Sequence, residues 1–237
     1  SQWAHLEFAA EDRALIERWT RSGAEIVGVY DYFYGAPFLF PRPTIYAVKD
    51  TIPFHHRAGV KAFFAEMNPN WALDGPKPWL TAQLLWAPER NPDELLDLYY
   101  REFWAEAAEP MREFHALCDR IWREHRAPAL WLRYYQDEGQ VWMYSPAQLA
   151  ALRGHLDAAT RVAQSEVVRA RVALAAAGFS VSEVFSDFWT ARLGVSRLAR
   201  PGVNPAELLA AWIAYRDART RFIDRFAGVQ RTHRLAL

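Results

Sequence analysis

The sequence predicts α/β units at the start of the chain, followed by a mainly α-helical bundle. The α/β part rests on residues 26–35 and 60–67, two short apolar runs that are typical of buried strands. The helical part rests on three N-cap residues placed directly before a proline, at Asn91, Ser145 and Asn204, each opening a long amphipathic segment. We therefore expect two domains, residues 1–90 and residues 91–237.

The first expected helix covers residues 11–22, because acidic residues fill its first turn and Gly23 follows as a C-terminal stop. The strand at 26–35 comes next, then a loop whose prolines at 37, 41 and 43 exclude both a helix and a central strand. Helical turns over 44–59 lead to the second strand and complete one strand-helix-strand unit. Residues 68–78 are rich in turn formers, and an apolar helix is expected over 79–86.

The helical part is expected to begin with a helix from Asn91-Pro92 to about Arg126, kinked or split at Pro110. The second helix should cover 147–177 and end at Gly178, a further one 181–193, and the last 206–229. Residues 130–135 and 140–144 fit either irregular aromatic packing or a short hairpin. Long amphipathic helices with short connections are typical of a helical bundle.

Composition argues against several classes of partner. Lys plus Arg equal Asp plus Glu, at 28 each, and no basic stripe is present, so nucleic acid is not an expected partner. No apolar run approaches the ~20 residues that cross a bilayer, so we expect no membrane partner. One cysteine, Cys118, cannot form an intrachain disulfide. Because the chain begins at Ser1 within what resembles a repeating α/β pattern, we expect a fragment or a processed product.

Motifs for a cofactor or a metal are absent from the sequence. It contains no Gly-rich phosphate loop, no His-Glu-x-x-His and no Gly-x-Ser-x-Gly. His55 and His56 are adjacent and would point about 100° apart on a helix. His115 and Cys118 lie three apart among apolar residues, where buried packing is the commoner role. We expect no cofactor and no metal.

Acidic and aromatic residues gather where both predicted strands end. Asp31 ends the first run and Glu66 ends the second. In two parallel neighbouring strands, both carboxylates lie at the carboxyl edge of the sheet, where ligands bind in α/β folds. Paired carboxylates suit hydrolysis of a glycosidic bond, with one protonating the leaving oxygen while the other activates water or attacks carbon. The residues expected to bind the sugar are Tyr30, Tyr32, Tyr34, Asn68, Asn70 and Trp71.

A purely structural role explains the same residues. Asp31 would cap a turn, Glu66 would pair with a nearby cation, and the tyrosines would pack in the core. The pattern alone leaves both interpretations open.

A set of motifs joins these strand ends to the next helices: Tyr-Asp-Tyr-Phe-Tyr-Gly at 30–35, the segment 59–66, Asn70-Trp71, and Trp-Leu-Thr-Ala-Gln-Leu-Leu-Trp-Ala-Pro at 79–88 before Asp-Glu-Leu-Leu at 93–96. The set resembles the last barrel units of a large, mostly uncharacterised glycoside-hydrolase-like family that is similar to the α-glucuronidases. The resemblance implies that residues 1–90 are the C-terminal units of a (β/α)8-type barrel and precede a helical domain.

The resemblance also implies a role for individual residues. Asp31 takes the place of the strand-end acid that helps to activate water in an inverting mechanism, and Asn70 and Trp71 match the Asn-Trp loop. The α-glucuronidases have Glu where Asp31 stands, and this chain has an extra aromatic residue before Gly35. The general acid of such barrels comes from an earlier strand that this chain does not contain.

Two hypotheses from different classes follow. In the first, the chain is part of a glycoside-hydrolase-like protein acting on carbohydrate, supplies a base or a substrate-binding wall, and is incomplete as an enzyme by itself. Its helical domain is expected to mediate a homodimer. In the second, the chain is a non-catalytic carbohydrate-binding or helical assembly module in which these acids are structural. Two carboxylates open to one cleft would favour the first; separated or ion-paired carboxylates would favour the second.

Overall fold

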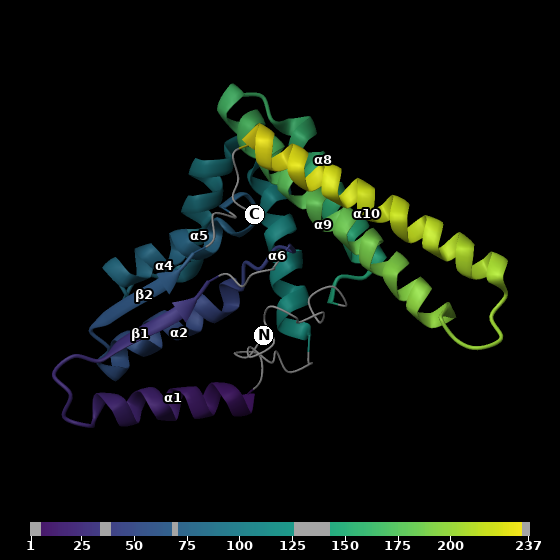
Figure 1. Cartoon of the computed structure of the whole chain (residues 1–237). Coiled ribbons are helices and arrows are strands. Elements are labelled where there is room, and N and C mark those ends of the chain that lie inside the picture. Colours follow the sequence, from purple (N-terminus) through teal and green to yellow (C-terminus); the bar gives the residue numbers. More distant parts are fainter. Residues whose placement is uncertain (1–5, 34–38, 68–70, 126–142, 234–237) are drawn as a thin grey trace.

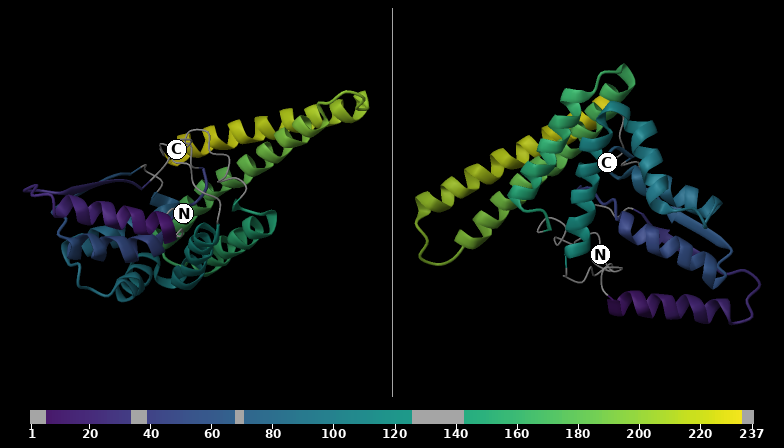
Figure 2. Two further views of the ribbon diagram at one scale, coloured as in Figure 1. Left: turned by 90° about the horizontal axis from the view of Figure 1, so that it is seen from below. Right: turned by 180° about the vertical axis from the view of Figure 1, so that it is seen from behind.

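A computed structural model describes residues 6–33, 39–67, 71–125 and 143–233 of the chain. Within these ranges the protein is mostly helical, with two parallel strands in its N-terminal part and a helical bundle after them. Figure 1 shows helices packed beside the small sheet and a long helical hairpin, formed by α9 (Glu166–Leu198) and α10 (Pro205–His233), extending away from it. The views in Figure 2 show the same projection of the hairpin from two other sides.

The two predicted strands are present and parallel. β1 (Gly28–Tyr32) pairs with β2 (Ala62–Glu66), with Gly28 opposite Ala62 and Tyr32 opposite Glu66. The connection between them is α2 (Ile45–Ala58), which ends at Gly59 with a φ of 90° that favours glycine. This confirms one strand-helix-strand unit, although both strands are shorter than predicted. The described residues form a two-stranded sheet and do not close a barrel.

Short helices surround this unit. α1 (Leu6–Thr20) ends before Gly23, as predicted, but begins five residues earlier than Glu11 and buries none of its side chains. Residues 71–74 and 76–78, expected as turns, are helical instead, in α3 (Trp71–Asp74) and at the start of α4 (Pro76–Trp86). The prolines at 76 and 78 do not prevent this, because the first turn of a helix leaves its amides without intrahelical acceptors.

The segment after residue 90 is divided, as expected, but at a different residue from the one predicted. It comprises α5 (Pro92–Tyr99), a π-helical turn η2 (Tyr100–Trp104), a 3-10 turn η3 (Ala105–Ala107) and α6 (Ala108–Glu124). Asn91 caps α5 by accepting from the amide of Asp93 at 2.9 Å. The break lies before Pro110, at Ala105 with a φ of 43°, because Pro110 occupies the first turn of α6.

The C-terminal helices are divided differently from the prediction, and the segment predicted as a separate helix over 181–193 is part of α9 (Glu166–Leu198). α8 (Pro146–Val162) starts with a capping box between Ser145 and Gln148, and α10 starts after Asn204, as expected. The predicted helix over 147–177 is wrong, because α8 ends at Val162 and Ser165 caps the new helix α9. α9 then continues through Gly178 without stopping.

One hydrophobic core joins the two predicted domains. Leu80 from the strand-bearing part and Phe114 and Phe179 from the helical part are fully buried in the same cluster. The core therefore continues across residue 90. The segments 130–135 and 140–142, for which a hairpin was considered, lie outside the described residues. None of the helices in the described ranges has the length and apolarity to cross a bilayer.

Candidate functional site

One face of the sheet carries exposed aromatic rings and a carboxylate. Successive residues of a strand point to opposite faces, so Tyr30, Tyr32, Phe64 and Glu66 share one face. Tyr30 and Phe64 are 52% and 60% exposed, and their rings stack with centroids 5.2 Å apart. The Tyr30 hydroxyl donates a hydrogen bond to the Glu66 carboxylate, and the Tyr32 ring lies edge-on to Tyr30 at 5.0 Å. We call these four residues the aromatic face.

The opposite face packs against helices. The Phe63 ring lies 5.9 Å from that of Phe33 and 6.3 Å from that of His55, which belongs to α2. Alternation along β1 places Asp31 on this face as well. Burial lowers the pKa of His55 and of Lys77 in α4, and the negative charge of Asp31 raises both pKa values in opposition. The Oδ1 atom of Asp31 also accepts from the amide of Tyr32 at 2.7 Å. Asp31 is therefore turned toward the helical layer.

The register separates the two carboxylates proposed to act together. Asp31 stands opposite Ala65, whereas Glu66 stands opposite Tyr32. Alternation along the strands places Asp31 and Glu66 on opposite faces of the sheet. Both lie near its carboxyl edge, as expected, but only Glu66 belongs to the aromatic face. A catalytic role for either residue stays a prediction.

The remaining predicted sugar-binding residues are not placed by the structure. Tyr34, Asn68 and Asn70 lie outside the described residues. Trp71 is described only as the first residue of α3, without its side chain. Of the predicted binding set, the structure brings Tyr30 and Tyr32 together with Glu66.

A buried cluster of charges lies behind the sheet, and sequence analysis did not find it. Lys77 is 4% exposed, and its Nζ atom donates to the main-chain oxygens of Phe33 at 2.8 Å and Arg42 at 3.4 Å. The Asp74 carboxylate accepts from the main-chain amide of Arg42 at 2.5 Å. These bonds tie the segment that follows β1 to α3 and α4.

Burial shifts the protonation of both members of this pair. Burial raises the pKa of Asp74 to about 6, against the opposing charge of Lys77. Burial also lowers the pKa of Lys77 to about 7, helped by the nearby positive charge of Arg42. Shifted acids and bases are frequent in functional sites, but structural ion pairs produce them as well.

A weak sequence signal for Lys77 existed. Lys77 stands between Pro76 and Pro78 in the first turn of an apolar helix, where a cation opposes the helix dipole. A cation in that position needs acceptors elsewhere, and here the acceptors come from residues far away in the sequence.

The histidine and cysteine residues do not assemble a metal site in the described part of the chain. No group of three or more His, Cys, Asp or Glu side chains there is arranged to hold a metal ion. His115 and Cys118 are buried in the core, with His115 among the rings of Tyr100, Trp104 and Phe114. The Nε2 atom of His56 lies 3.3 Å from the Glu89 carboxylate on the surface.

The strand-bearing part of the chain is also the part that matches a known family model. Residues 8–116 match the model of a domain of unknown function, DUF4838. The match contains both strands, the aromatic face and the Asp74–Lys77 cluster, and it ends within α6. No curated protein and no solved structure matches the chain. The DUF4838 region therefore extends beyond residue 90, as the shared core does.

Proposed function

We propose that the DUF4838 region supplies a carbohydrate-binding wall to a glycoside-hydrolase-like protein. The observation that carries the proposal is the exposed stack of Tyr30 and Phe64 beside the Glu66 carboxylate. One face of a sugar ring presents C–H groups, which pack against the electron-rich face of an aromatic ring. A carboxylate beside the rings accepts hydrogen bonds from sugar hydroxyl groups.

The exposure of these rings supports a binding role over a packing role. Large apolar groups that gather on a surface mark binding sites more often than isolated ones do. Tyr30, Phe64 and Tyr32 form one contiguous group of rings near the carboxyl edge of the sheet, the edge at which α/β folds bind ligands.

Within this proposal, Glu66 is the acid that meets the sugar. Asp31, the residue that the family resemblance assigns to water activation, faces the helical layer and acts on the buried cations. Hydrolysis of a glycosidic bond requires two carboxyl groups, about 5–10 Å apart, flanking that bond. The second acid would then come from another strand of the same protein, so the contribution of this chain is binding plus one carboxylate.

The test is calorimetric titration of the protein with neutral oligosaccharides and with oligosaccharides that carry uronic acids. Tyr30→Ala and Phe64→Ala should each weaken binding about two- to tenfold, since a lost stacking contact is worth on the order of 0.5–1.5 kcal/mol. Glu66→Gln should weaken binding while the fold is kept. Trp19→Ala is the matched control, because Trp19 is an exposed aromatic residue, at 58%, that lies on α1 and is not part of the aromatic face; α1 contacts α2. Equal losses in the control and the test variants, or no binding by any sugar, would contradict the proposal.

A non-catalytic module is the second candidate. The separation of Asp31 and Glu66 onto opposite faces favours it, because it removes the two-acid site from this chain. This candidate would be selected if the chain binds sugar but Glu66→Gln leaves the turnover of the intact protein unchanged.

The homodimer through the helical domain stays a prediction. α10 exposes Leu209, Trp212 and Ile213 on the projecting hairpin, which is the surface such a dimer would use. Light scattering of the wild type and of Trp212→Ala measures the oligomeric state directly.

A further inference from the structure

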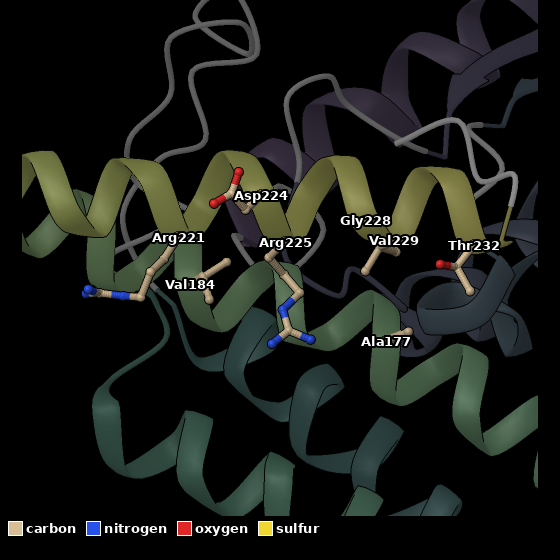
Figure 3. Close-up of a pocket in the computed structure, with 8 residues that line it drawn as sticks. All are labelled: Ala177, Val184, Arg221, Asp224, Arg225, Gly228, Val229 and Thr232. Carbon is tan, nitrogen blue, oxygen red and sulfur yellow. The ribbon is translucent and has the colours of Figure 1, made fainter.

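A pocket of about 570 Å³ lies between α9 and α10, away from the sheet and outside the region that matches DUF4838. Figure 3 shows Arg221 and Arg225 of α10 pointing to the same side of the helix, toward α9. Ala177 and Val184 of α9 form an uncharged wall, and Thr232 adds a hydroxyl group. The volume falls in the range of small-molecule sites, roughly 300–1,000 Å³.

The two guanidinium groups have no counter-ion in the described part of the protein. None of the ion pairs or hydrogen bonds formed there involves the side chain of Arg221 or Arg225. The one carboxylate in the described lining is that of Asp224, and Figure 3 shows it pointing away from the side of α10 on which both arginines lie. Two acids of α9 lie near this end of α10. Glu183 pairs with Arg153 of α8. Asp187 lines a neighbouring pocket together with Arg221, and no ion pair joins the two among the described residues.

Helix stability does not explain this arrangement. Arg221 and Arg225 are four residues apart, so they are neighbours on the helix surface and repel one another. A favourable interaction of cations with the helix dipole is confined to the last turn, and both arginines precede the last turn of α10, which ends at His233. The chain as a whole has a net charge of zero, whereas the lining of this pocket holds two arginines and one aspartate.

We propose that this pocket binds a phosphate monoester of a small organic molecule. A phosphate monoester carries a charge of about −1.5 to −2 at neutral pH, which matches two unpaired guanidinium groups. Each guanidinium fork can donate two parallel hydrogen bonds to phosphate oxygens. The organic part of the ligand then packs against Ala177 and Val184. Two arginines line the pocket, which fits a single phosphate group; the other arginines of α10, at positions 216, 219 and 231, do not line it.

The test is calorimetric titration of the whole chain with phenyl phosphate, with inorganic phosphate and benzoate for comparison. Phenyl phosphate should bind more tightly than inorganic phosphate because of the apolar wall, and more tightly than benzoate because benzoate has one charge. Arg221→Gln and Arg225→Gln should each weaken the binding of phenyl phosphate at least tenfold. Arg219→Gln is the matched control: an exposed arginine of the same helix that does not line the pocket, expected to change affinity less than twofold.

Two further measurements separate a site from general attraction to positive charge. Affinity for phenyl phosphate should rise between pH 5 and pH 8, because the monoester loses its second proton with a pKa near 6. Asp224→Asn should tighten binding a few-fold by removing the nearby negative charge. The proposal is overturned if phenyl phosphate does not bind, if Arg219→Gln weakens binding as much as Arg221→Gln, or if benzoate binds as tightly as phenyl phosphate.

Discussion

The Nζ atom of Lys77 lies 2.8 Å from the main-chain oxygen of Phe33, 44 residues earlier in the chain, and 4.8 Å from the centre of the Phe33 ring. The same Nζ atom also reaches the main-chain oxygen of Arg42. One buried cation therefore fixes both ends of the segment that joins β1 to α2, directly behind the sheet. The position of the carboxyl edge of β1 depends on this contact.

Replacing Lys77 with methionine should destabilise the protein. Lys77→Met removes the donor for two carbonyl groups and leaves the buried Asp74 carboxylate without its nearest cation, a change that costs about 2–4 kcal/mol of unfolding free energy. Urea denaturation at pH 7 measures the loss. Lys61→Met, at an exposed position before β2, is the control and should change stability by less than about 0.5 kcal/mol. Equal effects of the two variants would show that the Lys77 contacts do not stabilise the fold.

Lys77 also predicts how stability changes in alkaline solution. Its pKa is lowered to about 7 in the fold, against 10.5 for an unperturbed lysine. Between these values the unfolded chain binds more protons than the folded chain, so this residue makes the unfolding free energy rise with pH from about 7 to about 10. The rise should be smaller in Lys77→Met than in the wild type. Denaturation curves at pH 7, 8.5 and 9.5 for both proteins test this, and parallel pH profiles would exclude it.

Two neighbouring phenylalanines test the assignment of the sheet faces. Phe63 contacts Phe33 and His55 on the helical side, whereas Phe64 stacks on Tyr30 in solvent. Phe63→Ala should cost about 2 kcal/mol of unfolding free energy, because it removes a partly buried ring from the core. Phe64→Ala should cost less than about 1 kcal/mol. A larger loss for Phe64→Ala would mean that the faces are assigned the wrong way round.

The sequence predicted the strands and most helix starts because these depend on local chemistry. Asn91, Ser145 and Asn204 all begin helices, since an N-cap side chain and a proline at the next position act within one turn. Parallel pairing of the two strands followed from the length of the connection between them. The faces of Asp31 and Glu66 follow from the alternation of side chains once the pairing of β1 with β2 is known. The sequence alone does not determine that pairing.

Features that depend on distant contacts were not predictable in this way. The pattern around Asp74 and Lys77 indicated turns, because Pro and Gly dominate it, yet the fold buries both charges against Arg42 and Phe33. The start of α9 at Ser165 lacked a glycine or proline to mark it. Gly178 carries the opposite signal, since a glycine after a long helical pattern predicts a helix stop, whereas Gly178 is an interior residue of α9.

Gly178 provides a direct test of that correction. A methyl group at position 178 would lie 3.5 Å from the nearest side-chain atom of Leu73, an ordinary packing distance. Gly178→Ala should therefore stabilise the protein by about 0.5–1 kcal/mol, because alanine favours a helix interior and loses less conformational freedom on folding. Thermal denaturation measures the change. A helix that ended at Gly178 would require a left-handed backbone there, and the alanine variant would then be destabilised.

His115 predicts part of the response of the protein to acid. Burial among aromatic rings lowers the pKa of His115 to about 4, against 6.5 in an unfolded chain. Between pH 6.5 and pH 4 the unfolded state binds the extra proton, so His115 lowers the unfolding free energy as pH falls, by about 2–3 kcal/mol at pH 4. Asp74 acts in the opposite direction, because its raised pKa of about 6 makes the folded state bind a proton in nearly the same interval. The pH dependence of the wild type alone therefore does not separate the two groups.

The comparison with His115→Phe separates them. As pH falls from 6.5 to 4, the unfolding free energy of His115→Phe should rise relative to that of the wild type. A His155→Gln control should follow the wild type. A difference between His115→Phe and the wild type that does not change with pH would show that His115 does not resist protonation.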